Sequence, residues 1–153
     1  MDHMYAVLSI LLVGRLSIFL FTDQDNEGEK SRKYILNAIH RENGQRNYIE
    51  KGLVHAKEND TILISDVDEI PNLKQVNNLR KYKYTVFKQK NLFYKLNLIN
   101  KSLPNWFGSR ICKKKYLKSP QWIRDQKVKK FSILRFYRIK WNIIENGGWH
   151  FSY

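Results

Sequence analysis

The segment Ile-Leu-Ile-Ser-Asp-Val-Asp-Glu-Ile-Pro, residues 62–71, constrains the fold of this 153-residue chain more than any other feature. A short apolar run, typical of a buried strand, ends abruptly in Asp66, Asp68 and Glu69, and Pro71 prevents the strand from continuing. Ligands of open α/β sheets bind outside the carboxyl ends of the strands. The segment therefore predicts an α/β sheet with a ligand site where this strand ends.

The three crowded carboxylates indicate a cation site, because like charges at short range repel one another. Mn²⁺ and Mg²⁺ take oxygen ligands and commonly bridge protein carboxylates to substrate phosphates. We therefore expect a divalent metal and a phosphorylated substrate here. The alternative is an ordinary acidic turn, because Asp bonds its own backbone and tolerates unusual dihedral angles.

Length and composition predict one globular domain with a modest core, since 42% of the residues are hydrophobic. The single cysteine, Cys112, excludes an internal disulfide and is expected to be a small buried hydrophobe. Residues 1–71 contain eight basic and twelve acidic side chains, whereas residues 72–153 contain twenty basic and two acidic ones. The basic half would attract polyanions such as nucleic acid, anionic lipid or a diphosphate, or would form a solvated lysine-rich surface.

Residues 4–21 are apolar enough to raise the question of a membrane anchor. Arg15 would lie near the bilayer centre at a cost of about 2.5–3.5 kcal/mol on insertion scales. We therefore favour two buried strands, at 6–13 and 16–21, over a signal anchor.

The spacing of apolar residues predicts a mixed α/β order along the chain. Residues 22–33 are polar, contain Gly28 and are expected to form a loop, whereas residues 42–58 have helical spacing. A short helix is expected at 71–79. We expect strands at 61–65, 84–88, 92–98, 109–112 and 132–141 and after Gly147-Gly148, with basic connections at 113–118 and 126–130.

Gln45 and Arg46 are candidate anion-binding residues near the start of the expected helix at 42–58. A helix start offers free backbone N–H groups, and a guanidinium suits a phosphate or a carboxylate. The alternative is a solvated first helical turn.

The C-terminal residues contain a candidate metal ligand. Period-two alternation puts Trp149, Phe151 and Tyr153 on one packed face and His150 and Ser152 on the opposite face. The imidazole could bind a metal and the hydroxyl a sugar, although a single histidine is more often structural. Trp149 could stack on a sugar ring or pack in the core.

Four sequence blocks occur in this order: Gln45-Arg46 with Gly52-Leu53, Ile-Ser-Asp-Val-Asp-Glu-Ile-Pro at 64–71, Trp-Phe-Gly at 106–108 with Arg110, and Gly-Gly-Trp-His-Phe-Ser-Tyr at 147–153. In these blocks the chain resembles glycosyltransferase family 17, which includes the β-1,4-mannosyl-glycoprotein 4-β-N-acetylglucosaminyltransferases. The resemblance covers residues 16–153. Its second and fourth blocks are specific together, though neither is specific alone.

The resemblance implies a glycosyltransferase-A-like mixed sheet flanked by helices. It also implies metal-dependent, inverting transfer of N-acetylglucosamine from UDP-GlcNAc to a glycan acceptor, such as the β-linked mannose of an N-glycan core. The implied roles are metal binding by Asp66, Asp68 and His150 with Mn²⁺ or Mg²⁺, catalysis by Asp68 and Glu69, donor binding by Gln45, Arg46, Asp66 and Arg110, and acceptor binding by Trp149 and Ser152. The general base is unassigned, because Asp125 and Glu145 match no motif.

Residues 1–15 do not resemble the strand-helix-strand unit with which that family opens. We therefore expect an incomplete N-terminal nucleotide-binding unit, and a truncated or partial family member whose single domain spans residues 1–153. An anchor at 4–21 would imply the Golgi membrane, and its absence would imply the cytoplasm. The acceptor glycan and the oligomeric state stay open.

Two other functions compete with this interpretation. In a haloacid-dehalogenase-like phosphatase Asp66 would be the nucleophile and Asp68 the acid/base, but the chain lacks a suitable pair of downstream acids. A nucleic-acid-binding module would use the basic, tyrosine-rich half, as at residues 81–95. That function leaves the acidic cluster unexplained, so nucleic acid is not the expected partner.

Overall fold

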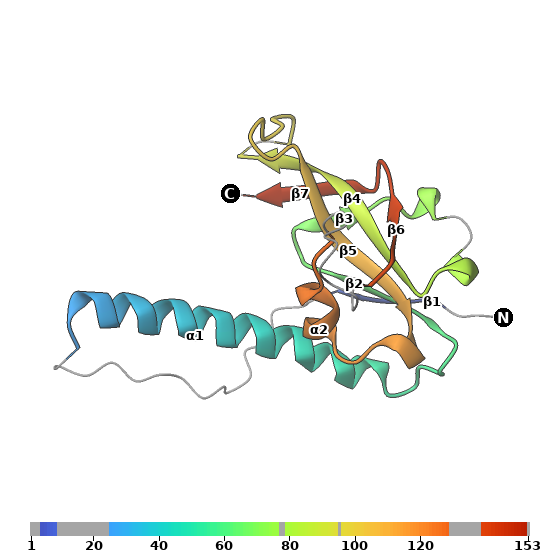
Figure 1. Cartoon of the computed structure of the whole chain (residues 1–153), viewed down its shortest axis with the longest axis horizontal. Helices are drawn as coiled ribbons and strands as arrows, with labels where there is room; N and C mark the ends of the chain where they lie inside the picture. The colour runs from blue at the N-terminus through green and yellow to red at the C-terminus, as the bar shows by residue number, and fades with distance from the viewer. Residues whose placement is uncertain (1–3, 9–24, 77–78, 95, 129–138, 153) are drawn as a thin grey trace.

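The computed structural model describes residues 4–8, 25–76, 79–94, 96–128 and 139–152. Within these ranges the chain is a mixed α/β structure, which confirms the predicted class (Figure 1). Its helices and strands are β1 (Met4–Leu8), α1 (Glu27–Tyr48), the 3₁₀ helix η1 (Ile49–Leu53), β2 (Thr61–Ser65), β3 (Glu69–Pro71), the 3₁₀ helices η2 (Leu73–Gln75) and η3 (Leu79–Lys81), β4 (Tyr84–Phe93), β5 (Asn105–Lys113), the 3₁₀ helix η4 (Lys114–Tyr116), α2 (Pro120–Asp125), β6 (Trp141–Ile144) and β7 (Gly148–Ser152).

The described strands form one mixed sheet in the order β1-β2-β5-β4-β7-β3, and β6 lies beside β4. Strand β1 runs parallel to β2, while β5 runs antiparallel to both β2 and β4. Strands β6 and β7 both pair in parallel with β4, β6 along its first half and β7 along its second half. The short β3 pairs antiparallel with β7. This pairing brings the end of the acidic cluster, at Glu69, against β7.

Alternating side chains of the central strands fill a core on each face of the sheet. On one face Ile62 and Ile64 of β2 pack with Cys112 of β5, covered by Leu53 of η1 and Ile123 of α2. Figure 1 shows the end of α1 and helix α2 side by side on this side of the sheet. On the other face the core consists of Leu63, Phe87, Ile111 and Ile144, with Val76 and Leu79 packed against it.

Both helices begin at a recognisable cap. Asn26 accepts a hydrogen bond from the backbone of Glu29, whose side chain accepts one from the backbone of Asn26 in return, which is a capping box. Helix α2 begins with Ser119, whose hydroxyl accepts from the Trp122 backbone, and Pro120 occupies the first turn. The last turns of α1 pack on α2, and its first turns extend away from the sheet (Figure 1).

Several predicted boundaries are wrong. The loop prediction for 22–33 fails from Glu27 onward, because the capping box starts α1 there, and the predicted helix at 42–58 is the end of α1 followed by η1. The predicted helix at 71–79 consists of two separate 3₁₀ turns. The strands predicted at 84–88 and 92–98 are one strand that ends at Phe93, and α2 was not predicted.

Other predictions are confirmed or only partly covered. Strand β2 has the predicted bounds, and β7 follows the predicted turn at Gly147-Gly148. Strand β1 overlaps the strand predicted at 6–13, whereas the strand predicted at 16–21 lies outside the described residues, as does most of that predicted at 132–141. No helix in the described part of the chain is long and apolar enough to cross a membrane.

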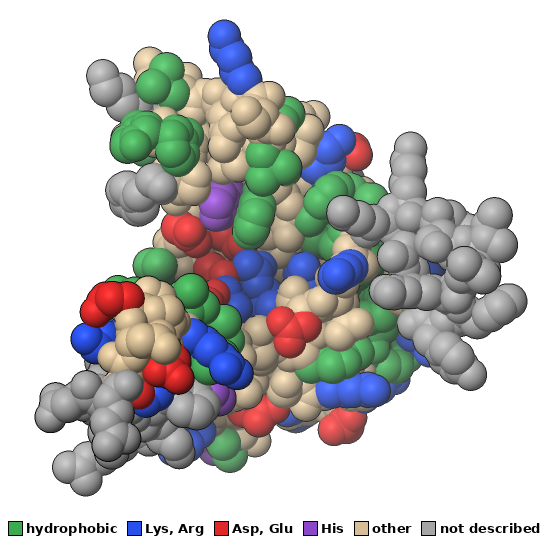
Figure 2. All heavy atoms as spheres, turned by 60° about the vertical axis from the view of Figure 1, so that its left-hand side comes forward, with side chains coloured by type: hydrophobic (Ala, Val, Ile, Leu, Met, Phe, Trp, Pro, Cys, Tyr) green, Lys and Arg blue, Asp and Glu red, His purple; other side chains and the backbone are tan. Residues whose placement is uncertain are grey.

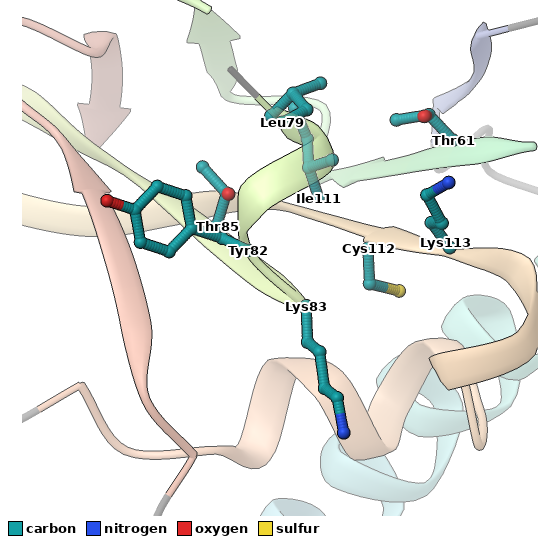
Figure 3. A pocket seen from close by; sticks show the side chains of 8 residues that line it. All are labelled: Thr61, Leu79, Tyr82, Lys83, Thr85, Ile111, Cys112 and Lys113. Atoms are coloured by element: carbon teal, nitrogen blue, oxygen red, sulfur yellow. The ribbon is translucent and has the colours of Figure 1, made fainter. Parts of the chain in front are cut away.

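A small cavity of about 20 Å³ lies between the start of β4 and the end of β5, and it is lined by residues that include Leu79, Thr85, Ile111 and Cys112 (Figure 3). Its volume suffices for about one water molecule. Cys112 is buried as predicted, and burial raises the pKa of its thiol to about 12. The thiol is therefore protonated at neutral pH, and neither it nor the cavity forms a reactive centre.

Candidate functional site

The acidic segment leaves β2 toward the end of α1 and toward α2, where two arginines meet Asp66. Arg46 binds the carboxylate with two hydrogen bonds, from Nε to Oδ1 at 3.1 Å and from Nη2 to Oδ2 at 2.6 Å. Arg124 of α2 donates to the same Oδ2 from Nη2 at 2.7 Å. In Figure 2 acidic and basic side chains meet in the middle of this face, below a histidine. Asp66 is therefore neutralised by protein groups on both sides.

Glu69 is buried and fully engaged. Trp106 Nε1 donates to its Oε1 at 2.9 Å, and Ser109 Oγ donates to its Oε2 at 3.2 Å. Arg124 contacts both carboxylate oxygens, at 2.8 and 3.1 Å, and the Asp66 backbone N–H donates to Oε2 at 3.2 Å. A carboxylate with these partners holds Arg124 and the strand end in place, and it is closed to a substrate.

The hydrogen bonds around Glu69 continue into the sheet. Ser109 Oγ lies 2.7 Å from Ser65 Oγ and accepts from Gln89 Nε2 at 3.2 Å. Gly108 is required at this point, because a Cβ there would lie 1.8 Å from Gln89 Oε1 and 2.8 Å from Glu69. The Trp-Phe-Gly block of the sequence therefore packs against Glu69 of the acidic segment, through Trp106 and Gly108.

Opposing effects set the ionisation of the Arg46–Asp66 pair. Burial alone would raise the pKa of Asp66, but the hydrogen bond from Arg46 and the charges of Arg124 and Arg46 lower it below its ordinary value. Burial alone would lower the pKa of Arg46, and the Asp66 contacts raise it above its ordinary value. Both groups are therefore charged at neutral pH.

Asp68 has a different partner, His150 of β7. Its Oδ2 lies 3.3 Å from His150 Nε2, and its side chain is 36% exposed, whereas that of His150 is only 9% exposed. Burial raises the pKa of Asp68, His150 lowers it in part, and the charges of Glu69 and Asp66 raise it further, so the net shift is upward. Trp106 stacks on the imidazole with ring centroids 4.6 Å apart, which fixes the plane of the ring.

Asn91 determines which nitrogen of His150 carries a proton. Asn91 Nδ2 donates to the Leu103 carbonyl at 3.0 Å, so its Oδ1 faces His150 Nδ1 at 3.0 Å and must accept a hydrogen bond from it. In the neutral ring, the remaining nitrogen, Nε2, then presents a lone pair to the Asp68 carboxylate. Two acceptors face each other there, and only a proton or a cation between them removes the repulsion.

The β3–β7 pairing brings these two groups together, since Glu69 lies opposite His150 in the register. The approach depends on Gly148, whose φ is +113° and whose Cβ, if present, would lie 2.0 Å from the Ile70 carbonyl oxygen. Phe151 N–H also donates to the Asp68 carbonyl at 2.9 Å. The second and fourth sequence blocks therefore form one site.

The other predicted binding residues lie at varying distances from this cluster. Arg110 is buried behind α2, where it donates to the Ile123 carbonyl and lies over the Trp141 ring, and its Nε has no partner among the described residues. Burial lowers the pKa of Arg110 to about 10, and the charge of Arg124 contributes. Gln45 is half-buried and makes no hydrogen bond to the cluster among the described residues.

Of the two alternatives for Trp149, stacking on a sugar or packing in the core, the structure excludes packing in the core. Trp149 is 42% exposed and His150 is 7% exposed, because β7 turns the His150 face toward Asn91 and Trp106. Ser152 is half-buried, and its carbonyl accepts a hydrogen bond from the Tyr94 backbone. Tyr153 lies outside the described residues.

The prediction that Arg46 lies at a helix start is also wrong, because it occupies the last turn of α1. There its charge complements the negative end of the helix dipole, and no free backbone N–H groups are offered. Sequence reasoning missed Arg124 and Asn91. The Ser119-Pro120 pair, a typical helix start, could have revealed the helix that presents Arg124.

Few side chains of the cluster are available to a divalent cation. Among the described residues no group of three or more His, Cys, Asp and Glu side chains is arranged to bind a metal. Asp66 and Glu69 are occupied by arginines, which leaves Asp68 and His150 as one oxygen donor and one nitrogen donor. Two protein ligands suit a cation whose remaining ligands come from water and substrate phosphates. The pair therefore offers two ligands at most and does not form a closed structural metal site.

The exposed carboxylate of Asp125 lies at the edge of the cluster. Arg46 Nη1 donates to Gln121 Oε1 at 3.1 Å, and Gln121 Nε2 donates to Asp125 Oδ1 at 2.7 Å. Glu145, the other downstream acid, lies elsewhere and pairs with Lys88 at 2.9 Å.

The chain matches no protein-family model, and no curated protein or solved structure matches it.

Proposed function

We propose that this chain is a metal-dependent glycosyltransferase with a glycosyltransferase-A-like fold. It would transfer N-acetylglucosamine from UDP-GlcNAc to a glycan acceptor. The observation that carries the proposal is the Asp68–His150 pair, in which a carboxylate oxygen lies 3.3 Å from an imidazole nitrogen and both atoms could bind one cation. Arg46 and Arg124 lie beside this pair, and they would have to release Asp66 to bind an anionic donor.

Asp68 and His150 would hold Mn²⁺ or Mg²⁺. When bound, the metal neutralises negative charge on the departing diphosphate. Asn91 and Trp106 fix the tautomer and plane of the imidazole, as groups behind a metal ligand commonly do. Glu69 acts as a positioning residue, because its buried carboxylate holds Arg124 and the strand end.

Arg46 and Arg124 would bind the diphosphate. Both guanidiniums donate hydrogen bonds to the Asp66 carboxylate, so two donors converge on one anion at the end of β2. Exposed Trp149, adjacent to His150 on β7, has a ring surface suited to the acceptor sugar, and Ser152 lies two residues beyond His150.

The competing functions have less support. A phosphatase nucleophile at Asp66 would have to react while paired with two arginines, which reduces its nucleophilicity. A nucleic-acid module would use the lysine-rich strands but would leave the buried network around Glu69 and His150 without a purpose.

A thermal-shift titration tests the proposal. We expect UDP and UDP-GlcNAc to stabilise the chain only with Mn²⁺ or Mg²⁺ present, since a ligand of the native state stabilises it by mass action. Asp68→Asn should abolish the metal-dependent shift. Glu145→Gln is the matched control, because this exposed carboxylate lies outside the cluster, and it should leave the shift unchanged.

Three outcomes would overturn the proposal. Equal metal-dependent stabilisation of Asp68→Asn and of the unaltered chain would show that Asp68 does not bind the metal. Release of inorganic phosphate from an aryl phosphate would favour the phosphatase. RNA binding that falls steeply with salt and persists in Asp68→Asn would favour the basic module.

A further inference from the structure

The turn between β4 and β5 is unusually apolar for an exposed segment. It stands out from one end of the molecule in Figure 1, and Figure 2 shows hydrophobic side chains and a basic side chain at the same end. We call residues 94 and 96–103 the hairpin tip. Large hydrophobic side chains that are about half to four-fifths exposed crowd it: Tyr94 (75%), Leu96 (79%), Leu98 (49%), Ile99 (51%) and Leu103 (49%).

The hairpin tip holds a defined shape. The Phe93 N–H donates to the Leu98 carbonyl at 2.8 Å, and the Asn100 N–H donates to the Asn91 carbonyl at 2.9 Å. Asn100 Oδ1 also accepts from the backbone N–H groups of Ser102 and Leu103. These backbone groups are satisfied within the chain, so an apolar environment would not leave them unpaired.

The charged residues of the hairpin tip and of the two strands that it joins are all basic. The sequence contains no Asp or Glu between Glu69 and Asp125. Exposed lysines flank the apolar side chains, at Lys90 on β4 and Lys101 in the turn itself. Apolar residues with a basic surround complement a membrane that carries anionic headgroups, since each basic residue near such a surface adds to the attraction.

We propose that the hairpin tip inserts into the interfacial region of an anionic membrane. A stable protein–protein interface uses about 20–30 residues on each side, whereas this tip presents five large side chains on a narrow turn. A bilayer accepts a small convex apolar tip without a complementary partner surface. Asn91 joins the tip to His150, so insertion would hold the candidate site close to the membrane surface.

Vesicle flotation with the full chain tests this inference. We expect the chain to float with vesicles of phosphatidylcholine and phosphatidylserine, and binding to weaken with salt and without phosphatidylserine. Leu96→Ser should lower the partition coefficient about tenfold, because burial of several carbon atoms is lost. Val54→Ser is the matched control, since Val54 is 74% exposed on the connection after η1, and it should bind as the unaltered chain does.

A labelling experiment reports insertion directly. A polarity-sensitive dye can be attached at Leu96→Cys or, as a control, at Val54→Cys, because the native Cys112 is buried. Only the dye at position 96 should show blue-shifted emission with anionic vesicles. An equal emission shift at both positions, or no shift at position 96, would overturn the inference. It would also be overturned if Leu96→Ser lost a dimer but kept its binding to vesicles. These readouts need neither metal nor nucleotide, so they are independent of the proposed transferase activity.

Discussion

Arg124→Met should strongly destabilise the chain, because Arg124 compensates a buried charge. The Arg124 side chain is 7% exposed and that of its partner Glu69 is 1% exposed, with 2.8 Å between Nη2 and Oε1. Removal of one partner from a buried ion pair costs about 3–5 kcal/mol, since the other charge stays desolvated. Asp66 keeps its bond to Arg46, so most of the expected loss comes from Glu69.

A double-mutant cycle separates charge from packing. Glu69→Gln in the Arg124→Met background removes the unpaired charge, so the double variant should be about 2–3 kcal/mol more stable than the sum of the single losses. Lys30→Met is the control, because its pair with the 91% exposed Glu27 contributes about 1 kcal/mol or less.

Urea unfolding followed by tryptophan fluorescence gives these free energies. An Arg124→Met loss no larger than that of Lys30→Met would refute the role of Arg124 as the partner of a buried charge. This role is refuted equally if the losses of the two single variants simply add.

Three further predictions concern the site and the core. Arg46 and Arg124 lower the pKa of Asp66, so the contribution of Asp66 to stability is complete above the ordinary value of 3.8 and is lost as the pH falls through the lowered pKa. Arg46→Met removes one of these partners, so this variant should begin to unfold in acid at a higher pH than the unaltered chain. Gly148→Ala should cost more than about 2 kcal/mol in urea unfolding, because its φ is +113° and a Cβ meets a carbonyl oxygen at 2.0 Å, whereas equal losses in Gly148→Ala and Gly28→Ala would contradict the argument. Cys112, whose pKa burial raises to about 12, should react with a thiol reagent at pH 8 only as the chain unfolds, and rapid labelling of the native chain would contradict its placement.

Much of the local structure could be predicted from the sequence where one signal dominates. The apolar run Thr61–Ser65 has a clear strand pattern and ends at a carboxylate cluster, so β2 was predicted with its observed bounds. The start of α1 was missed because its first half is polar, and only the capping box from Asn26 to Glu29 marks it. The sequence pattern predicts two strands in place of β4, because polar residues interrupt the apolar run. One of these polar residues, Gln89, is fully buried and donates a hydrogen bond to Ser109.

The candidate site could be predicted only in part, because its parts are far apart in sequence. The acidic side chains of residues 66–69 are neighbours along the chain, so their clustering needed no tertiary information. The pairing of Asp68 with His150 depends on the β3–β7 register, and the contacts of Arg124 span 55 and 58 residues. Composition and periodicity do not determine such contacts, so the neutralisation of Asp66 by two arginines was not foreseen.

The proposed function depends on a cation site formed by Asp68 and His150. Electron paramagnetic resonance of Mn²⁺ tests it most directly, because bound ion no longer contributes to the sharp signal of the free ion. In the presence of UDP, the unaltered chain should reduce the free-ion signal, while Asp68→Asn and His150→Phe should leave it at the level of a protein-free sample. Equal Mn²⁺ uptake by both variants and the unaltered chain would contradict a cation site at this pair.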